Sequence, residues 1–221
     1  MMIFSGPLFS YLGGLASERI IQDYSSDWIS GNLAFLRKGG MKIKEWKDDP
    51  QRPCFQEELP SDAYQAFLLK ASSAMMGMPM LTSFPHGFKC NRHPLVLKAS
   101  RSRDMIWAKT LFSLLFVPSD DMFSYHTTLP DAGYVLASST SALAELLERV
   151  NSCSWCADSY ALVSWSDESK ADCRKIIGKI LPDEDGNIDG EAAAKYAYSL
   201  LYRGLLFSLS GGTPLFLRVG K

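Results

Sequence analysis

The stretch that decides the fold is EAAAKYAYSLLYRGLLFSL, residues Glu191–Leu209. From Tyr196 onward its apolar residues fall on most sides of a helix, and a helix that is apolar all round has to be buried. The glycines of Ser210–Gly212 stop this helix, and the segment Pro214–Val219 that follows is typical of a strand. The sequence therefore predicts a long, buried C-terminal helix with a strand after it.

Upstream of this helix, segments with the patterns of strands and helices alternate. Leu143, Leu146, Leu147 and Val150 form one apolar stripe at helical spacing behind a Ser141 cap. The elements predicted for this half are a strand at Gly133–Ala137, a helix from Ser141 to Val150, a strand at Tyr160–Trp165, a helix at Ser166–Leu181 and a loop at Pro182–Gly190.

The first half of the chain is patterned less clearly. Ser61 is the expected cap of a helix, and Asp62 suits the positive end of that helix dipole. The segment Ser102–Phe116 satisfies neither the helical nor the strand period, so we interpret it as a helix with a strand as the alternative. The other elements predicted here are a short helix at Leu15–Tyr24, a strand at Met41–Lys47, a loop at Asp48–Pro60, a helix from Ser61 to the segment Met75–Pro79 and a strand at Leu95–Lys98.

These patterns together define the expected fold class. A chain of 221 residues with 47% hydrophobic and 21% charged residues is long enough to bury a core of its own. It contains no internal repeat and no long linker, so we expect a single globular domain over residues 1–221. Strands interleaved with helices favour an α+β fold of mixed α/β layers around the long C-terminal helix.

Charge and cysteine content indicate the compartment and the class of partner. The net charge of −1 provides no overall attraction to nucleic acid or to an anionic membrane. Five cysteines, an odd number, are typical of reduced thiols, so we expect a soluble, cytoplasmic protein. Met1–Ser17 lacks the basic start of a leader peptide, and charges interrupt the two most apolar later stretches, Met105–Val117 and Ala192–Leu209.

Acidic residues are concentrated in the loop before the C-terminal helix and at the start of that helix, a segment that we name the acidic loop. Such a loop would attract a basic surface of another protein electrostatically. The alternative interpretation is a solvated loop in which one acid caps the helix. The predicted partner-binding residues are Asp183, Glu184, Asp185, Asp189 and Glu191.

Two short pairs of thiol and imidazole groups are candidate metal ligands. A gap of two residues lets a turn present two ligands to one zinc ion, and four ligands complete a tetrahedron. The second pair is also a CxxC redox pattern, although it follows a predicted helix instead of preceding one. The remaining alternative is that these cysteines are small buried residues. The candidates are Cys90, His93, Cys153 and Cys156.

Enzymatic motifs are scarce. His126 precedes Asp131, whose carboxylate would be able to orient the imidazole for general-base chemistry of a hydrolase type. The chain contains no GxSxG, HExxH, P-loop or GxGxxG motif, and so we expect no cofactor. A calcium loop aligned on Gly186 would have Leu181 and Ala192 in place of its first and last carboxylates, which argues against calcium.

The segment Lys89–Lys109 is basic, but the overall charge argues against a nucleic-acid partner. Separate acidic and basic segments favour protein recognition, and Trp28, Trp46 and Trp165 are either interface anchors or core residues. The sequence therefore predicts a non-enzymatic protein-binding protein, for example an inhibitor or immunity-type protein that occludes a partner's active site. The alternative is a small hydrolase-like enzyme or a zinc-stabilised protein.

Overall fold

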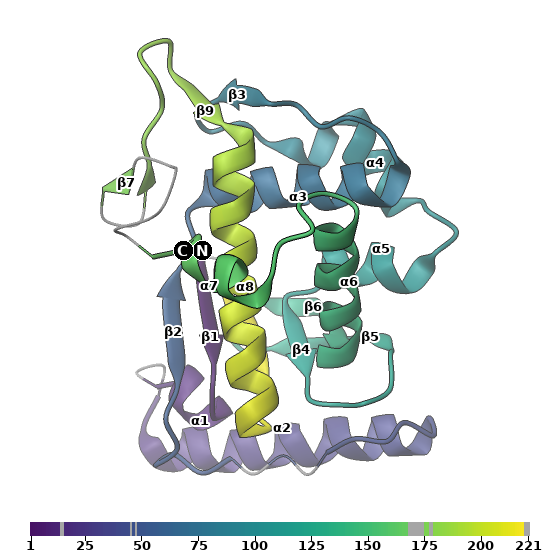
Figure 1. Ribbon diagram of the computed structural model, residues 1–221. Coiled ribbons are helices and arrows are strands. Elements are labelled where there is room, and N and C mark those ends of the chain that lie inside the picture. The colour runs from purple at the N-terminus through teal and green to yellow at the C-terminus, as the bar shows by residue number, and fades with distance from the viewer. Residues whose placement is uncertain (14–15, 45, 47, 168–174, 177–178, 219–221) are drawn as a thin grey trace.

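A mixed β-sheet forms the middle layer of the molecule (Figure 1). The computed structural model describes residues 1–13, 16–44, 46, 48–167, 175–176 and 179–218. Within these ranges the sheet has six strands in the order β2-β1-β10-β4-β6-β5, and every neighbouring pair is antiparallel except β4 and β6. The strands are β1 (Met2–Ser5), β2 (Phe55–Glu58), β4 (Leu115–Val117), β5 (Ser124–Leu129), β6 (Gly133–Ser139) and β10 (Leu215–Arg218).

Helices cover the sheet, and two short ladders lie outside it. The ladders pair β3 (Ser83–Pro85) with β9 (Asn187–Asp189) and β7 (Lys175–Ile176) with β8 (Lys179–Ile180). The helices are α1 (Leu8–Tyr11), α2 (Glu18–Lys38), α3 (Ser61–Met76), α4 (Pro94–Ser100), α5 (Met105–Leu111), α6 (Thr140–Ser152), α7 (Ser159–Ser164) and α8 (Gly190–Gly211), with one 3-10 turn at Cys90–Arg92.

The central strands are apolar on both faces, which requires a helical layer on each side. In β10, Leu215 and Leu217 pack into the core shared with α3, α6 and α8, whereas Phe216 packs into the core shared with α1 and α2. The first strand repeats this alternation with Ile3 and Phe4. The result is a sheet between two helical layers, because successive side chains of a strand point to opposite faces.

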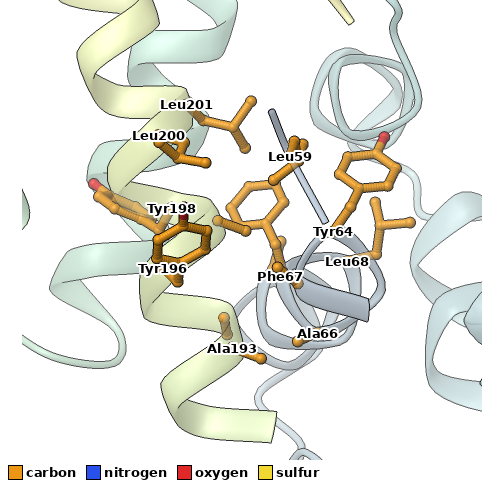
Figure 2. Packing of buried hydrophobic residues seen from close by; sticks show 14 of the residues in the cluster. Leu59, Tyr64, Ala66, Phe67, Leu68, Ala193, Tyr196, Tyr198, Leu200 and Leu201 are labelled. Atoms are coloured by element: carbon orange, nitrogen blue, oxygen red, sulfur yellow. The ribbon is translucent and has the colours of Figure 1, made fainter. Parts of the chain in front are cut away.

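The larger core lies between α3 and α8, whose side chains interdigitate in Figure 2. The Phe67 and Tyr198 rings lie 6.4 Å apart at a tilted angle, and the Tyr198 hydroxyl donates a hydrogen bond to the Leu147 carbonyl at 2.9 Å. Helix α8 also approaches the sheet closely at Gly204, where an added Cβ would lie 3.0 Å from side-chain atoms of both Ile3 and Leu215. This glycine therefore fixes the distance between the helix and the sheet.

The second core joins α2 to the opposite face of the sheet. Trp28 is buried there, and its indole donates a hydrogen bond to the Thr128 carbonyl at 2.6 Å. Its ring meets Trp46 edge to face at 5.5 Å. Both tryptophans therefore belong to the core and do not form a surface anchor.

The structure confirms the predicted α+β fold of mixed layers and the long buried C-terminal helix. The single domain over residues 1–221 stays a prediction. The helix from Ser61, the strand at Gly133–Ala137 and the helix after Ser141 are present with small changes of bounds. The predicted caps were wrong, because Pro60 holds the N-cap position of α3 and the Ser139 side chain caps α6 by accepting from the Ala142 amide. None of the helices within the described ranges has the length and apolar character of a membrane span.

Several predicted elements were wrong. Leu95–Lys98 lies in helix α4, because Pro94 occupies the first turn, where its fixed φ favours a helix. Tyr160–Trp165 mostly forms helix α7, which the Asp158 side chain caps by accepting a hydrogen bond from the Ala161 amide at 2.8 Å. In Met41–Lys47 the described residues show one isolated bridge, from Ile43 to Ser119, in place of a strand.

Other elements differ in extent. Of the helix predicted at Ser166–Leu181, residues 168–174 and 177–178 lie outside the described part. Strands β7 and β8 occupy residues 175–176 and 179–180, and Ser166, Asp167 and Leu181 belong to no helix or strand. Ser102–Phe116 contains both a helix, α5, and the start of a strand, β4, which explains why neither period fits it. Strands β1, β2 and β5 and most of the long helix α2 were not predicted.

Candidate protein-binding site

The acidic loop is held against the core by the short ladder of β3 and β9. Phe84 pairs with Ile188 in this ladder, and both side chains are buried. The Gly190 amide donates a hydrogen bond to the Thr82 carbonyl at 2.8 Å, and an added Cβ at Gly190 would lie 2.9 Å from the Leu81 carbonyl oxygen. The absence of a side chain at Gly190 therefore lets the start of α8 pack directly on the β3 segment.

Beside this contact lies an open cavity with a volume of about 650 Å³, which we name the acidic cavity. Ile180, Leu181 and Pro182 contribute an apolar wall, and Thr82 and Ser83 contribute hydroxyl groups. Four of the five predicted partner-binding residues line it: Asp183, Glu184, Asp189 and Glu191. Asp185 is exposed at the turn and is not part of the lining.

Two of these acids have structural tasks. Asp183 Oδ1 accepts hydrogen bonds from the Asp185 amide at 3.0 Å and the Asn187 amide at 2.8 Å, which shapes the turn. Asp189 Oδ1 accepts from the Glu191 amide at 2.9 Å and the Ala192 amide at 3.0 Å, which caps α8. The helix-capping interpretation made from the sequence thus applies to Asp189.

Glu184 and Asp185 differ from those two acids. Both are exposed, and neither carboxylate forms a hydrogen bond or an ion pair with any described residue. No side chain in the described part of the chain therefore neutralises these two charges.

Glu191 lines the acidic cavity and is held by two donors. The Lys70 ammonium donates to both of its oxygens, at 3.1 and 2.9 Å, and the Trp155 indole donates to Oε1. Burial raises the pKa of Glu191, but the hydrogen bonds from Trp155 and Lys70, with the charges of Lys70 and Lys195, lower it further than burial raises it. The net pKa lies below the ordinary value, so Glu191 carries its charge into the mildly acidic range.

The thiol and imidazole pairs do not converge on one point. Cys90 is buried, and burial raises the pKa of its thiol to about 12. His93 caps α4, since its Nδ1 accepts from the Leu95 amide at 3.3 Å. Cys153 and Cys156 are exposed at the end of α6. Among the described residues, no three His, Cys, Asp or Glu side chains gather in the way that a metal site requires.

His126 does not meet the acid that the sequence suggested for it. Its ring stacks on Tyr134 at 4.9 Å on the edge strand β5, whereas the Asp131 carboxylate binds Tyr11 and Arg218. The structure instead pairs His86 with Asp62, at 2.7 Å between Nδ1 and Oδ2.

This histidine–carboxylate pair was not predicted. Asp62 is buried at the start of α3 and also accepts a hydrogen bond from the Gly87 amide, whereas more than half of the His86 side chain is exposed. The two residues lie 24 positions apart in the sequence, and no spacing rule relates them. The contact depends on how the 86–87 turn packs on α3.

The basic segment lies on the outer surface around α4 and α5. Trp107 in this segment is buried and is covered by the Arg149 guanidinium, 3.9 Å from the ring centroid, so it is not a stacking platform for a base. Trp165 is half-buried and meets the ring of Trp155 edge to face at 5.0 Å. The exposed basic residues are Lys89, Arg92, Lys98, Arg101 and Arg103.

Comparison of the chain with models of protein families, with curated protein sequences and with solved structures found no match. The inference of a function therefore depends on the geometry and charge of the acidic cavity.

Proposed function

We propose that this protein works by binding another protein, whose basic side chains enter the acidic cavity. The observation that carries the proposal is the convergence of Asp183, Glu184, Asp189 and Glu191 on one concave surface. A concave surface lined by charges of one sign concentrates its electrostatic potential, which raises the rate of encounter with an oppositely charged partner. This protein would then cover the surface of its partner that meets the loop, in the way that an inhibitor or immunity-type protein covers an active site.

The chemistry of the walls suits a lysine or arginine side chain. These side chains have an apolar stem and a charged end, and they bury the stem along apolar surfaces. In the acidic cavity, Ile180, Leu181 and Pro182 offer an apolar wall beside the carboxylates. The charge of Glu191 is already matched by Lys70, whereas Glu184 forms no ion pair with any side chain that the structure describes. Glu184 is therefore the principal residue expected to meet the partner's cation.

A photo-crosslinking experiment tests the proposal in the protein's own host. The crosslinker p-benzoylphenylalanine replaces Asp185 in one variant and Asp23 in another, because both acids are exposed, Asp185 follows Glu184 without lining the acidic cavity, and Asp23 lies on α2. We expect one discrete adduct from position 185 that is absent from position 23 and does not form at high salt. Adducts of equal yield at both positions, or none at position 185, would contradict the proposal.

Once the partner has been identified from the adduct and purified, the kinetics of its binding test the role of charge. The double variant Glu184→Gln with Asp185→Asn should associate several-fold more slowly and show a weaker salt dependence. Its matched control is Asp23→Asn with Asp27→Asn, which removes the same number of charges from exposed positions of α2. Equal rates for the two double variants would reject steering by the loop.

One observation favours an enzyme as a second candidate. The buried Asp62 carboxylate orients the exposed His86 imidazole, which is the arrangement of a general base and its positioning acid. Hydrolysis of p-nitrophenyl acetate tests this candidate. Activity that is lost in His86→Ala and retained in His126→Ala would favour it, and activity equal to that of free imidazole would oppose it.

A further inference from the structure

The turn that follows helix α6 carries two exposed thiols, Cys153 and Cys156, and we name residues 153–156 the CxxC turn. The Asn151 carbonyl accepts hydrogen bonds from the amides of Ser154 at 3.1 Å, Trp155 at 2.9 Å and Cys156 at 2.9 Å. These bonds keep the chain coiled in the manner of a helix. In a helical coil, Cα atoms three residues apart lie about 5 Å from each other, within the range of about 4.4–6.8 Å that a disulfide spans.

The Cys156 sulfur already lies beside the backbone of Cys153. Its thiol donates a hydrogen bond to the Ser152 carbonyl at 3.3 Å, and this oxygen belongs to the peptide group that joins Ser152 to Cys153. Oxidation to a disulfide removes the thiol hydrogen, and the hydrogen bond is then lost. A change of oxidation state at Cys156 therefore changes the contacts that hold the CxxC turn.

The backbone of Cys156 is unusual for a cysteine. Its φ of 48° makes it the one residue other than glycine with a positive φ in the part of the chain that the structure describes. Glycine or asparagine usually occupies such a left-handed position at the end of a helix. An unfavourable backbone conformation of this kind points to a use for the side chain that requires it.

The location of the pair argues against a catalytic dithiol. Catalytic pairs lie at the N-terminus of a helix, where the helix dipole stabilises a thiolate, whereas Cys153 lies at the C-terminal end of α6. The geometry therefore favours a site that is itself oxidised and reduced over a catalyst that transfers disulfides to other proteins.

Trp155 connects the CxxC turn to the rest of the protein. Its indole donates a hydrogen bond to Glu191 Oε1, and its ring meets those of Trp165 at 5.0 Å and Tyr198 at 5.2 Å, both edge to face. The Lys70 ammonium lies 5.1 Å from the centroid of the same ring. A rearrangement of the turn would therefore displace a ring that contacts α3 and α8 and that orients Glu191 in the lining of the acidic cavity.

We propose that Cys153 and Cys156 form a redox modification site, which a low-molecular-weight disulfide such as oxidised glutathione converts to an intramolecular disulfide. The thiolate of one cysteine attacks the glutathione disulfide and releases one reduced glutathione, and the other cysteine displaces the second. The new Sγ–Sγ bond replaces the bond of the glutathione disulfide, and two electrons and two protons pass from the protein to the released glutathiones. Trp155 transmits the change to Glu191. The site needs no partner protein, so this inference and the proposed function can fail separately.

Peptide mapping identifies the bond. The full chain is equilibrated in glutathione buffers, quenched with acid, alkylated and analysed by mass spectrometry. We expect Cys153 and Cys156 to lose two hydrogens together, whereas Cys54, an exposed thiol with no second cysteine at this spacing, should form a mixed disulfide with glutathione. A stable mixed disulfide at Cys153 or Cys156, or a bond from either to another cysteine, would overturn the proposal.

The unfolded chain is the control for the geometry of the turn. The equilibrium constant for formation of the disulfide should be about tenfold larger in the folded chain than in concentrated urea, because the folded turn already holds the two cysteines together. An equal or smaller constant in the folded chain would show that the turn does not favour the bond.

The indole NMR signals of two tryptophans test the transmission. Oxidation should shift the N–H signal of Trp155 and leave that of Trp28 unchanged, since Trp28 lies in the other core and binds the Thr128 carbonyl. An unchanged Trp155 signal in the fully oxidised protein would contradict the transmission to Glu191.

Substitutions at Cys156 separate a redox role from a structural one. Cys156→Gly suits the positive φ, so this variant should be at least as stable as the reduced wild type and yet form no intramolecular disulfide. Cys156→Ala also lacks the thiol but keeps a side chain at this φ, and it should be the less stable of the two. A clear loss of stability in Cys156→Gly would show that the cysteine is needed for packing and would count against the proposal.

Discussion

The Lys70 ammonium lies 2.9 Å from Glu191 Oε2 and joins the middle of helix α3 to the first turn of helix α8. The Lys70 side chain is 15% exposed, and its ammonium also lies 5.1 Å from the centroid of the Trp155 ring. This pair connects the lining of the acidic cavity with helix α3, which belongs to the larger core. A change of charge at Glu191 should therefore affect stability as well as binding.

Replacement of Lys70 by methionine should weaken the dependence of stability on pH. The pKa of Glu191 lies below its ordinary value in the folded protein, so the unfolded chain takes up a proton first as the pH falls through about 4.3. The stabilisation from Glu191 is thus present above that pH and is lost as the pH falls through the lower folded value. Urea unfolding from pH 3 to 7 should show a shallower acid decline for Lys70→Met, and an unchanged decline would contradict the assignment.

Substitutions of the acids of the acidic loop should differ in their effect on stability. Asp189→Ala removes the cap of α8 and should lower the free energy of unfolding by about 1 kcal/mol, whereas Asp189→Asn should restore most of it. Glu184→Gln should leave stability unchanged because its carboxylate has no described partner. Thermal unfolding of the three variants measures this, and equal losses at Asp189 and Glu184 would refute the division.

Two helical glycines should respond to alanine in different ways. Gly31 in α2 has nothing within 4 Å of an added Cβ, so Gly31→Ala should stabilise the protein by up to about 1 kcal/mol. At Gly204 the same gain in helix propensity is opposed by overpacking against Ile3 and Leu215, which costs about 1–3 kcal/mol. The midpoints of denaturant unfolding compare the two variants. A clear gain of stability in Gly204→Ala would show that α8 and the sheet have room for the added methyl group.

The cysteines should differ in reactivity in the native state. Of the cysteines in the part of the chain that the structure describes, Cys54, Cys153 and Cys156 are exposed, whereas Cys90 is buried and burial raises the pKa of its thiol to about 12. Iodoacetamide at pH 8, followed by mass spectrometry, should modify the three exposed thiols and leave Cys90 unmodified until the protein is unfolded. Early modification of Cys90 would contradict its burial, whereas protection of Cys153 and Cys156 that a chelator abolishes would support the zinc alternative.

The sequence was most informative where one local pattern determines the structure. The apolar run of α8, the Ser61 start of α3 and the stripe of α6 each have a period that tertiary contacts reinforce. It was least informative for β1 and β2, four residues long each, because a short strand becomes recognisable only through the strand beside it. The helices α4 and α7 were missed because Pro94 and Asp158 were not recognised as helix starts.

The candidate site was likewise predictable from the sequence only in part. The acidic loop was visible as composition, and its charges required no fold to be identified. Its concave shape was not predictable, since Thr82 and Ser83 come from a ladder that pairs residues about a hundred positions apart. The same is true of the contact between Asp62 and His86 and of the environment of Asp131.

The position of β10 has a consequence for how the polypeptide is made. This strand lies between β1 and β4, so residues 215–218 occupy the middle of the sheet, although they are synthesised after every other element described. While the ribosome still holds this segment in its exit tunnel, β1 and β4 lack their shared neighbour and both hydrophobic cores remain open. Neither core of a nascent chain can therefore close before residues 215–218 have left the tunnel, and apolar surface stays open to aggregation until then.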